Sequence, residues 1–193
     1  MEVNSMGFFD NIKKKIDDVK ASIPTGNEKR EIAFDDIPET LDAFKALPQA
    51  NLKDPFEVAA LAIVALNIYP VDKDTSIAMI DYLKGPDPLS GLDKSFIKDR
   101  FMDGKEYVVR SYFKGASPEN DYAPASPYTI VVESNPYSKI DDTNLQLWVT
   151  SFGADSPRPI GLRQKPSTGE WFLREFKGVL AGVREPVSQN PWA

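Results

Sequence analysis

The chain has 193 residues, enough for one ordinary domain or two small ones, and 41% of them are hydrophobic, which can supply a packed core. Its formal net charge is −6 at pH 7, without the basic surplus that nucleic acid phosphates require of a protein partner. The absence of cysteine and histidine excludes disulfides, thiolate nucleophiles, catalytic imidazoles and zinc sites built from these residues. We therefore expect no nucleic-acid partner, no metal site and no cofactor.

The first element expected along the chain is an amphipathic helix within residues 1–24, which Pro24 ends. Its apolar side chains recur at helical spacing and fall within one arc of about 100°. The five that we take as the partner-facing or membrane-facing stripe are Phe8, Phe9, Ile12, Ile16 and Val19. Lysines flank the stripe, so peripheral contact with a membrane through residues 7–23 is one interpretation. We favour the other, in which the stripe packs against protein, either this chain's own body or a partner.

Residues 25–104 form the predicted helical region. A polar connector, Thr25–Arg30, reads as a linker, and four helices are expected after it. Their start signals are Pro38, Asp54 followed by a proline, either Asp72 or Asp74, and Ser90. The longest apolar run, residues 58–66, is about half the length needed to span a bilayer, so it predicts a buried helix.

Residues 105–193 form the predicted β region, because the apolar period changes from helical to two at Lys105. The expected strands cover residues 106–113, 128–133, 145–152, 160–165 and 171–176. Helices and strands are segregated along the chain instead of alternating. We therefore predict an α+β fold, with a helical N-terminal half packed on a C-terminal antiparallel sheet or a small barrel-like meander. Residues 30–193 are expected to form one compact unit.

The two-residue period divides the predicted strands into two faces. The first is a core face of Tyr107, Val109, Phe113, Leu145, Leu147, Val149, Ile160, Leu162, Trp171 and Leu173. The second mixes guanidinium groups with aromatic rings, and its candidate ligand-binding residues are Arg110, Tyr112, Trp148, Arg163 and Arg174, beside Thr150, Phe172 and Phe176. Arginine and aromatic residues are enriched at binding interfaces. Alternatively, the acidic helical half covers this face and pairs with its arginines.

Two further stretches contain polar residues that merit separate interpretation. Asp141 and Asp142 are adjacent carboxylates, but a turn explains them, because Asp side chains bond to nearby backbone N–H groups. The stretch SFGADSPRPIGLR, residues 151–163, has the glycine and prolines of a connection between two strands; a ligand-contacting loop is the alternative. We identify no catalytic residues in either stretch.

Three segments in the second half of the chain resemble a known family: residues 111–118, SFGADSPRPIGLR, and the C-terminal segment from Gly169 to Ala193. Together they resemble an uncharacterised bacterial family, a domain of unknown function, over about residues 30–193. The opening GFFDNIKKKI is similar to the start of many small bacterial cytoplasmic proteins. The resemblance implies no activity and no assigned site.

We therefore predict a non-enzymatic, cytoplasmic binding or adaptor module that recognises a protein or a small anionic ligand through its arginine and aromatic face. The alternative is a hydrolase that uses carboxylates and arginine, without histidine, on a phosphorylated or glycosidic substrate. The sequence contains no convergent pair of acids that would favour this alternative.

Overall fold

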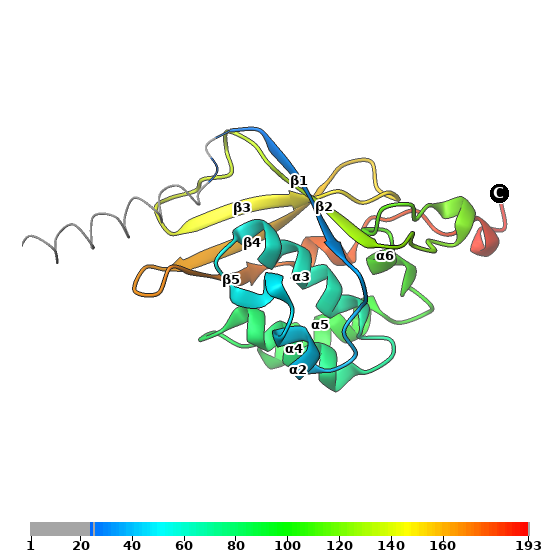
Figure 1. Cartoon of the computed structure of the whole chain (residues 1–193). Coiled ribbons are helices and arrows are strands. Elements are labelled where there is room, and N and C mark those ends of the chain that lie inside the picture. Colours follow the sequence, from blue (N-terminus) through cyan, green and yellow to red (C-terminus); the bar gives the residue numbers. More distant parts are fainter. Residues whose placement is uncertain (1–23, 25, 193) are drawn as a thin grey trace, which may run out of the picture.

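A computed structural model describes residue 24 and residues 26–192 of the chain (Figure 1). In this part of the chain five antiparallel strands form one open sheet in the order of the sequence. The strands are β1 (Glu28–Phe34), β2 (Tyr128–Ser134), β3 (Asn144–Val149), β4 (Arg158–Lys165) and β5 (Glu170–Glu175). The α+β fold is thus confirmed, and the sheet is open instead of closed into a barrel. The predicted helix that carries Phe8, Phe9, Ile12, Ile16 and Val19 lies outside the described residues.

The helices lie mainly between β1 and β2 in the sequence and pack on one side of the sheet (Figure 1). They are α2 (Leu41–Lys45), α3 (Pro55–Asn67), α4 (Lys73–Lys84), α5 (Gly91–Arg100) and α6 (Tyr107–Arg110). Short 3₁₀ turns cover Pro48–Asn51, Pro118–Asn120, Lys177–Leu180 and Val187–Gln189. No helix of the described residues is long and apolar enough to cross a membrane.

Helix α3 is the centre of the core. It is apolar around its whole circumference, and it contacts all five strands of the sheet. Asp54 caps it by accepting a hydrogen bond from the Phe56 N–H at 2.8 Å, and Pro55 occupies the first turn, where no N–H is needed. A helix without a polar face is stable only where other elements cover it on every side. The sheet and α4 supply most of that cover.

The start signals read from the sequence are confirmed for the next two helices. Asp72, and not Asp74, caps α4 by accepting from the Thr75 N–H at 3.0 Å. Ser90 caps α5 through a capping box, in which Ser90 and Asp93 each accept from the backbone of the other. These caps fix where the chain leaves each loop and enters the helical layer.

Two segments differ from the sequence-based expectation. The connector expected at Thr25–Arg30 overlaps β1, whose charged residues hid its strand character. The strand expected over residues 106–113 is instead α6 followed by turns, with a single β-bridge between Phe113 and Ile130. The side chains of this segment are buried as a core face requires, but on a short helix. Burial alone therefore did not distinguish the two backbone conformations.

The inner face of the sheet, which we define as the side that packs on α3, confirms the predicted core face. All ten residues of the prediction are buried, but Tyr107 and Val109 lie on α6 and Phe113 follows it, so these three are not part of the sheet. The other seven are Leu145, Leu147, Val149, Ile160, Leu162, Trp171 and Leu173. These seven alternate along β3, β4 and β5, where every second side chain points at the helices.

Candidate functional site

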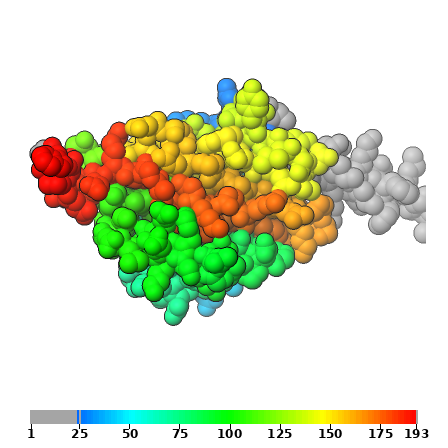
Figure 2. Space-filling model, turned by 180° about the vertical axis from the view of Figure 1, so that it is seen from behind, coloured from blue at the N-terminus to red at the C-terminus, as the bar shows by residue number. Residues whose placement is uncertain are grey.

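The outer face of the sheet, which we define as the side opposite α3, carries the candidate site. Along β3 the buried residues alternate with Asn144, Gln146 and Trp148, which are each half-buried. Their register partners on β4 are Arg163, Gly161 and Pro159 in that order. Viewed from behind, the segments coloured from yellow to orange, which include β3, β4 and β5, are open on the surface (Figure 2).

The cationic end of the outer face consists of Arg163 and Arg174. Arg174 on β5 donates from Nη1 to Oδ1 of Asn144 on β3 at 2.8 Å. Because β4 lies between those two strands, the Arg174 side chain crosses over β4. Arg163 on β4 is the register partner of the same Asn144, so both arginines are neighbours of Asn144 on this face. The Arg163 side chain is exposed and makes no hydrogen bond or ion pair with the other residues that the structure describes.

A β-bulge directs Arg174 towards Asn144. Leu173 pairs with Leu162, but Glu175 pairs with Gly161, so Arg174 is the extra residue between two successive pairs. A bulge of this kind bends the strand and redirects the side chain of its extra residue. A side chain on Gly161 would be crowded here, because its Cβ atom would lie 3.1 Å from the Cβ atom of Glu175 and one of the two strands would have to shift slightly.

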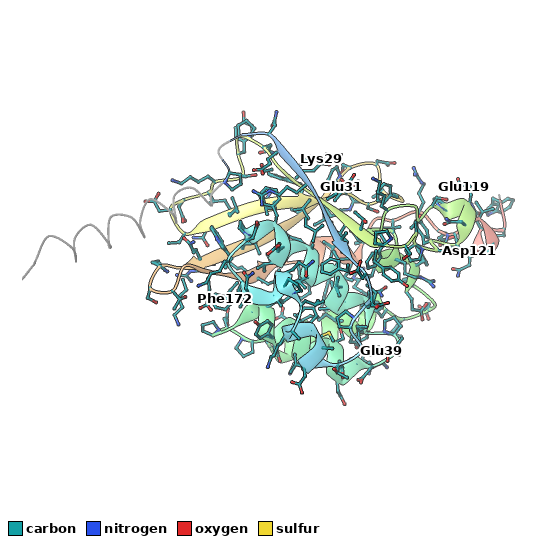
Figure 3. All side chains as sticks on the ribbon, viewed as in Figure 1. Lys29, Glu31, Glu39, Glu119, Asp121 and Phe172 are labelled. Atoms are coloured by element: carbon teal, nitrogen blue, oxygen red, sulfur yellow. The ribbon has the colours of Figure 1, made fainter. Side chains whose placement is uncertain are left out.

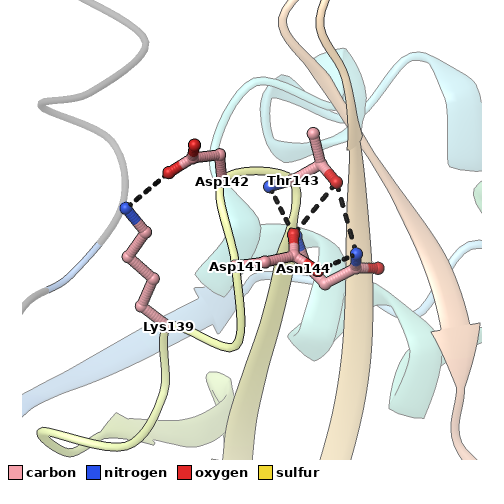
Figure 4. A network of polar contacts seen from close by, with 5 residues as sticks. All are labelled: Lys139, Asp141, Asp142, Thr143 and Asn144. Carbon is pink, nitrogen blue, oxygen red and sulfur yellow. Dashed lines mark hydrogen bonds and ion pairs between the residues drawn. The ribbon is translucent and has the colours of Figure 1, made fainter.

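The turn before β3 fixes the orientation of Asn144 (Figure 4). Asp141 accepts from the backbone N–H groups of Thr143 and Asn144, each at 2.8 Å, and from the Asn144 side chain at 2.7 Å. The backbone hydrogen bond from Thr143, followed by the side-chain bond from Asn144, lowers the pKa of Asp141 to about 2. The turn predicted at Asp141 and Asp142 is confirmed. It directs the Asn144 carbonyl oxygen at Arg174.

The aromatic end of the outer face is Trp148, which lies beside an open pocket of about 370 Å³. The pocket is lined by Asn27, Glu28, Lys29, Glu133, Ser134, Asn135, Trp148 and Pro157. Glu133 is fixed there, since it accepts from the Thr150 hydroxyl at 2.7 Å and pairs with Lys29 at 3.1 Å. Burial raises the pKa of Glu133, but these two hydrogen bonds outweigh it and lower the pKa overall.

The two ends of the outer face are separated by one run of β3. Trp148 lies four residues from Asn144, which corresponds to about 13 Å along a strand. Between them Gly161 is the register partner of Gln146 and has no side chain, so fewer side-chain atoms cover the sheet in the middle of the outer face. The arrangement can hold an extended segment that places a carboxylate at one end and an apolar group at the other.

Arg110 and Tyr112, the other two candidate residues, do not join the outer face. Tyr112 is fully buried and donates to the Val179 carbonyl at 2.8 Å, and burial raises its pKa. Arg110 is exposed at the end of α6. Both follow from the correction above, because a helix replaces the strand that would have aligned them with Trp148.

The aromatic rings expected beside Arg163 pack elsewhere, although Phe172 is the register partner of Arg163 on β5. Phe172 is half-buried, and its ring lies against Gly85 at the end of α4 (Figure 3 labels Phe172). Phe176 is buried in the core. Trp148 is therefore the aromatic residue that the outer face retains from the original prediction, at the opposite end from the arginines.

Residues 151–157 of the stretch SFGADSPRPIGLR connect β3 to β4 and residues 158–163 belong to β4, so the interpretation as a connection between two strands is confirmed. It also anchors the C-terminal segment: Arg158 donates from Nη2 to the Gly182 carbonyl at 2.6 Å and from Nε to the Ala181 carbonyl at 3.3 Å. Gly153 packs so closely on Tyr122 that a side chain at position 153 would overlap the Tyr122 ring. These contacts give Gly153 and Arg158 structural roles.

Sequence reasoning missed the charged residues that β1 brings to the pocket, Glu28 and Lys29, because β1 itself was not predicted. It also missed Asn144, which reads as part of a polar turn. Within the described residues no group of three or more Asp or Glu side chains could hold a metal ion.

The chain was compared with known proteins. A family model described as a domain of unknown function (DUF6935) matches residues 36–187, from the segment after β1 to the last 3₁₀ turn. No curated protein matches the chain, and no solved structure does. The predicted resemblance to a domain of unknown function is thereby confirmed. The matched residues include the whole outer face on β3, β4 and β5.

Proposed function

We propose that this chain, which belongs to the DUF6935 family of unknown function, is a binding module. Its outer face recognises acidic segments of a protein partner. One observation carries the proposal: the exposed Arg163 guanidinium has no partner among the described residues and lies beside Arg174, which Asn144 orients. A planar guanidinium presents a fork of N–H donors that matches a carboxylate. Arg163 is therefore the primary anchor for an acidic side chain.

The spacing of the outer face defines the partner further. Trp148 offers an apolar surface about 13 Å from Asn144, and an extended chain advances about 3.3 Å per residue. A matching segment therefore carries an acidic residue and an apolar residue about four positions apart. Tryptophan and arginine are typical anchor residues of interfaces.

The overall charge limits how such a module attracts its partner. With a net charge of −6 the whole protein repels an acidic segment at long range, so attraction must come from the local field of the two arginines. We expect a weak and reversible interaction that weakens further as salt is added. We place it in the cytoplasm, where a chain without cysteines needs no disulfides.

The hydrolase alternative has less support from the geometry. It needs a carboxylic acid whose pKa is raised towards neutrality and that faces a second carboxylate across a cavity. Glu133, the carboxylate beside Trp148, has a lowered pKa. Burial raises the pKa of Glu57, but that residue lies at the start of α3, beside Asp54 and Arg30. These observations favour binding without turnover.

The test uses a fluorescein-labelled peptide with two adjacent glutamates and a phenylalanine four positions later, and fluorescence anisotropy as the readout. The variant is Arg163→Ala with Arg174→Ala. Hydrogen bonds to charged groups contribute about 1.5–3 kcal/mol, so we expect the dissociation constant to rise about tenfold or more. The control, Lys94→Ala with Lys98→Ala, removes the same charge from exposed positions on α5 and should leave binding almost unchanged.

The outcome that contradicts the proposal is equal binding by the arginine variant and the wild type. Equal loss in both variants would contradict it too, because binding would then depend on net charge and not on the outer face. Release of p-nitrophenol from p-nitrophenyl phosphate and from p-nitrophenyl glycosides tests the alternative, since release would indicate turnover of a phosphorylated or glycosidic substrate.

A further inference from the structure

Strand β1 is at the edge of the sheet. The hydrogen bonds of its neighbour β2 determine which residues of β1 point their backbone N–H and C=O groups away from the sheet. Val131 accepts from the Thr150 N–H at 2.9 Å, on the side of β2 that faces away from β1. In an antiparallel strand the N–H and C=O of one residue point to the same side. Val131 therefore does not bond to its register partner on β1, Glu31, whose backbone groups must point away from β2.

A second contact shows independently that the backbone groups of Ala33 also point away from β2. Thr129 accepts from the Lys114 N–H at 2.8 Å on the far side of β2, so its partner Ala33 also points outward. The Gln49 side chain indeed donates to the Ala33 carbonyl from outside the sheet, at 3.1 Å. By the two-residue period Lys29 has the same direction as Glu31. Along residues 28–32 no other described strand pairs with this outward edge.

The side chains of this edge are arranged in a self-complementary order. Lys29 and Glu31 are both exposed and project from β1 (Figure 3). If a second β1 pairs antiparallel with the first about a two-fold axis at Arg30, Lys29 lies opposite the partner's Glu31, and Glu31 lies opposite the partner's Lys29. These are the residues whose backbone N–H and C=O groups point outward. One register thus satisfies both the backbone hydrogen bonds and the charges.

We propose that two copies of this chain pair through β1 in this register and join their sheets into one continuous antiparallel sheet. The inference does not rest on the proposed function, because its argument uses the backbone and charges of β1 and not Arg163, Arg174 or Trp148, although Lys29 also lines the pocket beside Trp148.

The residue on the axis, Arg30, does not oppose this pairing. Its guanidinium lies over its own Phe56 ring at 4.1 Å from the ring centre. It also donates to Glu28 and to Asp54, each at 2.6 Å. The two carboxylates compensate its charge within its own chain, so two Arg30 side chains can approach across the axis.

The edge is also nearly neutral within one chain. Lys29 pairs with Glu133 at 3.1 Å, and Glu31 pairs with Lys114 at 2.8 Å. Charged side chains, lysine above all, are one device that keeps edge strands from pairing with other chains, because like charges repel. Here each charge is already balanced on the outer face, and it gains an opposite charge from the second copy.

The test measures sedimentation velocity of the full chain over a series of concentrations. We expect concentration-dependent dimers for the wild type. Lys29→Glu and Glu31→Lys each place like charges opposite one another in the dimer, so each variant alone should associate at least tenfold more weakly. When the two variants are mixed, one chain carries carboxylates at both positions and the other carries ammonium groups at both. Opposite charges then meet at both contacts, and the mixture should regain the dimer.

Matched controls separate the edge from general charge effects. Glu39→Lys and Lys94→Glu make the same charge changes at exposed positions away from β1 and should leave the dimer intact. Circular dichroism confirms that every variant is folded. Glu31→Pro adds a second test, because it removes an outward N–H that the isolated fold does not use but the dimer needs.

Three results would overturn the inference. A wild type that stays monomeric at every concentration would mean that the charges on β1 prevent two copies from pairing. A dimer that persists in the single charge variants would place the interface elsewhere. Failure of the mixed variants to associate, when each is folded and monomeric, would exclude this register.

Discussion

The inner and outer faces of β3 place neighbouring residues under different constraints. Leu147 on the inner face is fully buried against the helical layer, whereas Gln146 and Trp148 on either side of it are half-buried on the outer face. The inner face of β3 is apolar, and on β4 and β5 the buried inner residues are apolar except for Gln164. The outer face keeps two arginines, an oriented amide and a tryptophan. Stability therefore constrains one face, and the other is available for recognition.

The largest expected effect is a difference in stability between substitutions at two neighbouring residues, one on each face of β3. Leu147→Ala removes a fully buried side chain and leaves a cavity, so we expect it to lower the free energy of unfolding by about 2–5 kcal/mol. Gln146→Ala should change it by no more than about 0.5 kcal/mol. Urea unfolding followed by circular dichroism measures both. Similar losses from the two substitutions would contradict the division of the sheet into a structural and an open face.

The second prediction concerns Phe172, which begins on the outer side of β5 but packs on α4. Gly85 has a positive φ of 59°, and a side chain there would overlap the Phe172 ring. Gly85→Ala should therefore cost about 1–3 kcal/mol more than Gly104→Ala, which shares the positive φ but has open space around it. Thermal unfolding compares the two variants. Equal costs would mean that the Phe172 ring is free to join the outer face.

The third prediction concerns pH and the helical layer. Hydrogen bonds from Lys177 and then Ser90 lower the pKa of Asp93 to about 2, from an ordinary value near 3.8. Because the folded-state pKa is lowered, the stabilisation is complete above pH 4 and is lost as the pH falls towards 2. Asp93→Asn should destabilise the protein by on the order of 1 kcal/mol at pH 7, with a smaller difference at pH 2. A difference that does not change between pH 7 and pH 2 would contradict this account.

Much of the fold was predictable, because burial leaves a periodic trace in the sequence. The alternation of Leu145, Leu147 and Val149 identified the inner face of β3, and the caps Asp54 and Ser90 identified the starts of α3 and α5. β1 was not predictable in this way. It is an edge strand whose charged first half lies at the border of the sheet, where burial imposes no alternation. The Tyr107–Arg110 segment was misread because its β-branched residues suit a strand but lie in a short buried helix.

The candidate site was predictable only in part. Trp148, Arg163 and Arg174 were assigned to one face because strand period alone determines which side they point to. Their arrangement within that face depends on features that leave no local signal. The bulge at Arg174 results from pairing between strands. The turn at Asp141 is local and was predicted, but the contact of Asn144 with Arg174, thirty residues away, was not. Phe172 was assigned to the same face, but α4 packs against its ring.

The most direct test of the open outer face is a comparison of two tryptophans by NMR. Trp148 lies on the outer face, and Trp171 is fully buried on the inner face. In ¹⁵N-labelled protein titrated with the acidic peptide described above, we expect the indole N–H signal of Trp148 to move and that of Trp171 to stay in place. Arg163→Ala with Arg174→Ala should shift the movement to peptide concentrations about tenfold higher or more. Equal movement of both signals, or no movement of the Trp148 signal while the peptide binds, would contradict recognition at the outer face.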